Sequence, residues 1–107
     1  IGHVADAEIT FCAAAKGEKK SPAGAEKTKT TKADLVAALK DATAYCSSVA
    51  DAMTDAKGTE AVKFFGGDMT RLGVLGFNNA HVMEHYGNIV TYMRIRGLVP
   101  PSSEPRK

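Results

Sequence analysis

Two histidines spaced four residues apart are the side chains of this chain best suited to chemistry. His81 and His85 lie in one uninterrupted stretch without proline. On an α-helix this spacing places both imidazoles on one face, about 40° apart around the axis, where they can bind one metal ion together. Such a site needs at least one further ligand. Of the 3 histidines in the chain, the remaining one, His3, can supply it if a second helix brings it to the same place.

The residues around the pair exclude a zinc-protease motif. Val82 stands where that motif has its glutamate, and Glu84 instead precedes the second histidine, so no carboxylate is placed as the base. Asn78, Asn88 and Tyr92 share the histidine face by the same helical count. The polar side chains that are candidates for orienting a ligand or a substrate are Asn78, Glu84, Asn88 and Tyr92. The alternative is a hydrogen-bonded polar layer that binds no ion.

The histidine pair belongs to a predicted helix from about residue 70 to 96, which Gly97 and the pair Pro100 and Pro101 end. Glu84 is the only formal charge between Arg71 and Arg94, so we expect other structure to cover this helix on most sides. Large apolar residues lie on the side opposite the histidines: Leu72, Leu75, Val82, Met83, Tyr86, Val90 and Met93. Small residues on one flank would let the backbone of another segment or of a second copy come close: Gly73, Gly76, Ala80 and Gly87.

Two further helices are predicted, over residues 1–16 and 31–56. Gly17 is a natural stop for the first, and Thr31 or Asp34 can cap the second. The second carries one apolar stripe, with residues three and four apart: Leu35, Leu39, Ala42, Cys46, Val49 and Met53. Residues 17–30 form a lysine-rich stretch, which we interpret as a solvated loop, with phosphate binding as the alternative. Residues 58–68 are predicted to be a connector whose aromatics close one end of the core, and residues 98–107 a tail.

The two cysteines, Cys12 and Cys46, are too far apart in sequence for a CxxC redox or zinc motif. The sequence favours a pair of small buried apolar side chains, because free cysteine packs well in helical cores. A disulfide between neighbouring helices is the other interpretation, and it would indicate an exported protein.

The composition is that of one small domain of 107 residues, with 44% hydrophobic and 24% charged residues and a formal charge of +2. Because the positive excess lies in the lysine-rich stretch and not on a periodic face, we expect no nucleic-acid partner. No apolar run is long enough to predict a membrane span. The chain begins inside an amphipathic pattern at Ile1, so we interpret it as a fragment or a processed form. Both a cytoplasmic location and export after removal of a signal peptide stay open.

Two segments resemble the DinB-like (DNA-damage-inducible) family. The stretch NAHVMEHYGNIVTYMRIRGLVPP, residues 79–101, resembles the last long helix of these proteins and the glycine and prolines after it. The opening IGHVADA, residues 1–7, resembles their second helix, where the first metal histidine lies. The resemblance implies an all-α, up-down-down-up four-helix bundle that here lacks its first helix. Its implied metal ligands are His3, His81 and His85, and the implied ion is divalent, nickel or zinc.

The resemblance also implies a function. Relatives include thiol-dependent transferases, so the chain is expected to be a metal-dependent thiol transferase that uses a small-molecule thiol on small electrophiles. The alternative is a non-catalytic metal-binding or dimeric scaffold bundle. An uncovered apolar stripe on the bundle predicts a homodimer. Neither Cys12 nor Cys46 is expected to be the nucleophile, because Cys12 faces away from His3 and Cys46 lies on a packing stripe.

Overall fold

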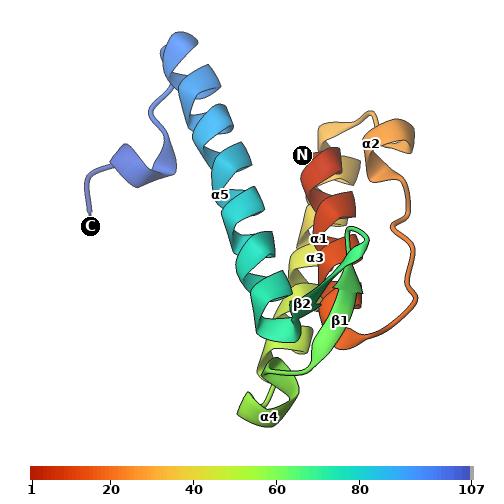
Figure 1. Cartoon of the computed structure of the whole chain (residues 1–107). Helices are drawn as coiled ribbons and strands as arrows, with labels where there is room; N and C mark the ends of the chain where they lie inside the picture. Colours follow the sequence, from red (N-terminus) through yellow and green to blue (C-terminus); the bar gives the residue numbers. More distant parts are fainter. Residues whose placement is uncertain (107) are drawn as a thin grey trace.

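Three long helices form the body of the chain in the computed structural model, which describes residues 1–106 (Figure 1). They are α1 (Gly2–Lys16), α3 (Lys32–Asp51) and α5 (Arg71–Ile95), and α1 packs against both of the others. The expected helical fold is confirmed in its main features, although a small antiparallel sheet accompanies the helices. The last residue of the predicted tail, Lys107, lies outside the described residues.

Helix α1 ends as predicted at Gly17, which adopts the left-handed conformation with φ of 77°. Its buried residues are mostly small, so α3 and α5 can approach its backbone from two sides. They are Gly2, Val4, Ala5, Ala7, Glu8, Phe11, Cys12, Ala13 and Ala15. The core of the chain is therefore centred on α1.

Helix α3 is shorter than the predicted helix over residues 31–56. The hydroxyl of Thr31 caps its start by accepting from the Asp34 amide, and the helix ends at Asp51. A separate single turn, α4 (Asp55–Gly58), follows because the Thr54 hydroxyl accepts from the Lys57 amide and starts a new helix there. A second N-cap inside the predicted range thus divides it.

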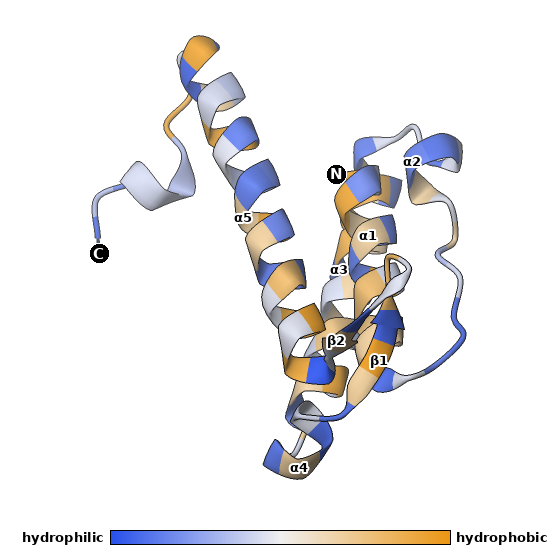
Figure 2. Ribbon diagram, in the orientation of Figure 1, coloured by the Kyte–Doolittle hydropathy of each residue, from blue (hydrophilic) through white to orange (hydrophobic). Residues whose placement is uncertain are grey.

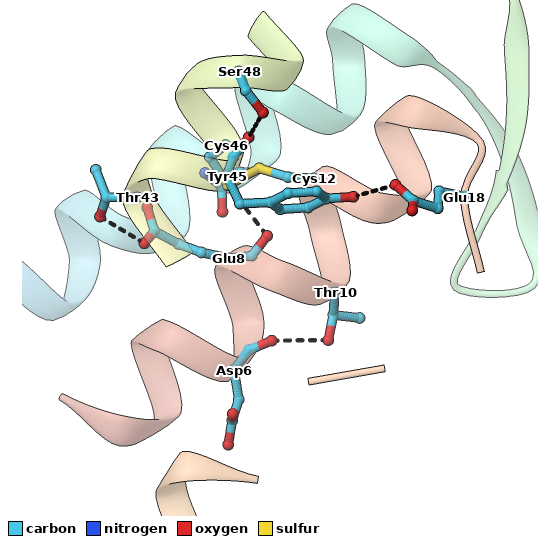
Figure 3. Close-up of a disulfide and its surroundings, with 10 residues drawn as sticks. Asp6, Glu8, Thr10, Cys12, Glu18, Thr43, Tyr45, Cys46 and Ser48 are labelled. Carbon is cyan, nitrogen blue, oxygen red and sulfur yellow. Dashed lines mark hydrogen bonds between the residues drawn. A yellow bond between two sulfur atoms is a disulfide. The ribbon is translucent and has the colours of Figure 1, made fainter. Parts of the chain in front are cut away.

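A disulfide joins α1 to α3 between Cys12 and Cys46, whose Cα atoms are 5.3 Å apart (Figure 3). The interpretation as two buried free thiols is therefore wrong. The packed helices bring the two Cβ atoms to bridging distance, which the sequence spacing of 34 residues does not reveal. The bond is almost wholly buried in the core, beside Phe11 and Val74.

The predicted connector over residues 58–68 is largely a β-hairpin. Strands β1 (Ala61–Phe64) and β2 (Gly67–Thr70) pair in antiparallel register, with Phe64 opposite Gly67. The two turn residues, Phe65 and Gly66, both have positive φ, 49° and 78°. This is the pattern of a two-residue hairpin turn, which usually has the sequence Asn-Gly. Because phenylalanine stands at the first position here, the sequence did not predict the hairpin.

Helix α5 is capped by the Thr70 hydroxyl and ends near Gly97, as predicted. The expectation that it is covered on most sides is wrong for the described chain, because only Val74 and Asn78 are buried. Its C-terminal half extends beyond the other helices with apolar residues in view (Figures 1 and 2). Large apolar side chains of α5 are at least 38% exposed: Leu72, Phe77, Met83, Tyr86, Tyr92 and Ile95.

The lysine-rich stretch contains a short helix, α2 (Ala25–Thr28), which corrects its interpretation as a loop only. The Asp6 carboxylate accepts from the backbone amides of Ala25 and Glu26 and so holds α2 against α1. Gly2 permits this contact, since a Cβ at residue 2 would lie 2.8 Å from the Cα of Glu26. One glycine and one aspartate of α1 therefore place α2.

None of the described helices is both long and apolar enough to cross a membrane.

Candidate metal centre

The three histidines of the chain come together between α1 and α5. The Nε2 atom of His81 lies 3.2 Å from Nε2 of His3 and 3.1 Å from Nε2 of His85. One ring nitrogen of each histidine lies within 4.8 Å of the others. Helix α1 thus supplies the third candidate ligand beside His81 and His85, because His3 lies in its first turn.

Two of the three spacings between these nitrogens fit one small cation. Around a tetrahedral ion with bonds of about 2.0–2.1 Å, neighbouring ligand nitrogens stand about 3.3 Å apart. The separations of 3.1 and 3.2 Å are close to this value. Neutral imidazoles that turn lone pairs toward one point repel each other unless a proton or a metal ion lies between them. The donor set of three nitrogens is one that zinc and nickel accept.

His81 is the central and most enclosed histidine. Burial lowers its pKa below the usual 6.5, and the neighbouring His85 and His3 lower it further. The neutral form is the one that binds a metal. Its other nitrogen, Nδ1, is buried and has no hydrogen-bond partner in the described structure, so the ring is held by packing, including an edge-on contact with Phe11 at 5.3 Å between ring centroids.

His3 is oriented by a residue that the sequence analysis did not single out. The carboxylate of Glu26 lies 3.4 Å from Nδ1 of His3, on the side of the ring away from His81. A carboxylate on the second nitrogen fixes the tautomer of a metal-binding histidine and raises its basicity. Glu26 reaches this place because α2 docks on Gly2 and Asp6. The only sequence signal for the contact between Glu26 and His3 is the spacing of Gly2 and Asp6 at the start of α1.

The four polar candidates of the sequence analysis do not join the histidines. Asn78 is buried, but its side chain lies toward α3, with Nδ2 3.9 Å from the Cys46 sulfur. Glu84, Asn88 and Tyr92 are exposed, with Tyr92 at 64%. They lie on the exposed side of α5, although His85 and Ile89 on the same turns line a cleft with α1 and α3. The sequence analysis selected them by their angle around the helix axis, and that angle does not show which side of α5 the other helices cover.

A second polar group lies in the core near the site. The buried Glu8 carboxylate accepts from the hydroxyl of Thr43 at 3.0 Å (Figure 3). Burial raises its pKa above the usual 4.5, although hydrogen bonding to Thr43 and Asn78 opposes the rise. Glu8 and His85 both line a cleft of about 160 Å³ between α1, α3 and α5. Nothing in the sequence marks Glu8 as buried, because a glutamate of an amphipathic helix ordinarily lies on its exposed face.

An aromatic cluster adjoins the histidines on the hairpin side. Phe11 of α1 contacts His81, and it also contacts Phe64, Phe65 and Phe77 edge-on, with ring centroids 5.2–5.9 Å apart. Of the two connector aromatics, Phe64 therefore packs against the core next to the candidate metal centre, whereas Phe65 is 76% exposed.

A family model for the DinB superfamily matches residues 1–89, which include all three histidines. The chain therefore belongs to the DinB superfamily. Proteins of this superfamily typically bind a metal ion, and the histidine cluster is the group of described residues suited to one. No curated protein and no solved structure matches the chain.

Proposed function

We propose that this DinB-like protein binds one divalent ion, zinc or nickel, through His3, His81 and His85. The observation that supports the proposal is the convergence of three ring nitrogens from two helices, with separations of 3.1 and 3.2 Å. Membership of the superfamily supports it independently. The carboxylate of Glu26 orients His3 from behind. The three helices α1, α3 and α5 would be members of the four-helix bundle of the family.

The proposed activity is thiol transfer to a small electrophile. Bound there, the ion would act as a Lewis acid that lowers the pKa of a small-molecule thiol. The protein would hold the ion from one side only, since its three nitrogens leave positions for other ligands. His3 is exposed at 48% of its side chain, so a small molecule can approach the site from solvent. The disulfide removes Cys12 and Cys46 as nucleophiles, so the thiol would come from the bound molecule.

The test is the metal content of His85→Ala. We expect purified wild-type protein to keep about one divalent ion per chain after gel filtration, and the variant to lose most of it, because two nitrogens hold the ion far less tightly than three. Thr91→Ala on the same helix is the matched control, since among residues 1–106 the Thr91 hydroxyl bonds only to the carbonyl of Gly87. Equal metal content in wild type and His85→Ala, measured by elemental analysis, would contradict the ligand assignment.

A non-catalytic dimeric scaffold is the second candidate, and the exposed apolar side of α5 favours it. Met83 and Ile95 are 62% and 75% exposed, and a Cβ added at Gly76 or Gly87 would meet nothing within 4 Å. A second copy packed along α5 would bury these residues. We expect a dimer in analytical ultracentrifugation and a monomer for Met83→Glu. A stable wild-type monomer at high concentration would contradict the dimer without affecting the metal proposal.

A further inference from the structure

Phe65 at the tip of the hairpin combines two unfavourable properties. It is the only non-glycine residue with positive φ among residues 1–106, at 49°, a conformation in which the Cβ of an L-residue crowds the backbone carbonyl. Its side chain is also 76% exposed. Asparagine before Gly66 would suit both the backbone and the solvent. Neither turn geometry nor core packing therefore explains a phenylalanine here.

The position of Phe65 connects it to the histidines. Its ring lies 4.5 Å from that of Phe64, 5.7 Å from that of Phe77 and 5.9 Å from that of Phe11, measured between centroids. Phe11 in turn contacts His81 at 5.3 Å. Ring contacts thus run from His81 through the buried ring of Phe11 to Phe65. Phe77, one helical turn before His81 on α5, is 38% exposed beside Phe65, and we call the exposed rings of Phe65 and Phe77 the aromatic surface. Figure 1 shows the hairpin lying over α1 beside α5.

We propose that this surface recognises the substrate of the histidine site, and that the substrate carries an aromatic ring. The inference rests on the proposed metal site and adds the class of molecule that enters it. A ring bound beside the ion would stack on Phe65 and exclude water from the reacting end. Strain at an exposed residue is retained where function requires the residue. Phe65 would thus be a specificity-determining residue, since it acts on the remote part of the substrate.

The test uses the full chain loaded with cobalt, whose absorption reports thiolate binding. Benzyl mercaptan and ethanethiol are the two probes, which bind through the same group and differ in the ring. We expect Phe65→Asn to weaken benzyl mercaptan binding about fivefold, the value of one aromatic contact, and to leave ethanethiol binding unchanged. The same variant should melt at a higher temperature than wild type, because Asn-Gly suits the turn.

Two controls separate recognition from folding. Phe65→Leu keeps an apolar side chain and the strained backbone, so it should weaken the aromatic probe without a rise in melting temperature. Leu98→Asn changes a residue that is 57% exposed and lies beyond α5, and it should alter neither probe. Equal affinities of wild type and Phe65→Asn for benzyl mercaptan would overturn the inference. A lower melting temperature for Phe65→Asn would also overturn it, because Phe65 would then be a structural residue.

Failure of the metal proposal gives a different result. If wild-type protein binds no cobalt, the metal site is rejected, and the aromatic surface is tested in the metal-free chain with benzyl alcohol. Amide chemical-shift changes at Phe65 and Gly66 that disappear in Phe65→Leu would support the surface. The absence of shifts at these residues in wild type would reject it.

Discussion

Helices α1 and α5 both carry histidines of the candidate site, yet they differ sharply in how they are held. In α1, nine of the 15 residues are buried, whereas only two of the 25 residues of α5 are. Helix α1 is packed between its neighbours and bonded to α3 through Cys12. Helix α5 is anchored at its N-terminal half by Val74 and by the hairpin. The site therefore joins a fixed helix to one whose outer faces remain free for a ligand or a partner.

The largest expected effect on this comparison comes from removing the disulfide that joins α1 to α3. Replacing Cys12 and Cys46 together by alanine should lower the free energy of unfolding by about 3–4 kcal/mol, the chain-entropy value for a separation of 34 residues. Urea unfolding measures the loss. Reduction of the wild type should reproduce it and should not affect the double variant further. An unchanged midpoint would mean that packing alone fixes α1.

Substitutions at the two ends of α5 test whether only its N-terminal end is anchored to the rest of the chain. Val74 is fully buried, so Val74→Ala should cost about 2 kcal/mol of unfolding free energy. Ile95 is 75% exposed, and Ile95→Ala should change the unfolding free energy by less than about 0.5 kcal/mol in the monomer. Thermal unfolding at a fixed low concentration compares them. A large loss for Ile95→Ala would show that a partner or a second copy covers the end of α5.

A pH-dependent effect concerns Glu8, the buried acid of α1. Because burial raises its pKa in the folded state above 4.5, its contribution to stability is complete below the unfolded value and is lost as pH rises through the folded pKa. Wild type should therefore lose stability relative to Glu8→Gln as the pH rises above the usual glutamate pKa of 4.5. Urea midpoints of both proteins, measured at pH values below and above 4.5, give the difference. A constant difference would show that Glu8 has equal pKa values in the folded and unfolded states.

The local features of the chain follow from its sequence. Gly17 and Gly97 end helices where they were expected to, and Thr31 caps α3. The spacing of His81 and His85 and their place on one helix face are likewise local properties, because backbone hydrogen bonds and helical periodicity connect residues only a few positions apart. The resemblance to DinB-like proteins pointed to His3 as their companion, and the structure brings it to them.

Contacts between distant residues were decided by the tertiary structure alone. Whether Cys12 meets Cys46, whether Glu26 reaches His3 and whether Glu8 is buried all depend on how helices dock, which no local pattern encodes. The hairpin depended on a phenylalanine adopting a backbone conformation that its own side chain disfavours. The pairing of β1 with β2 imposes this conformation on Phe65, and that pairing exists only in the folded chain.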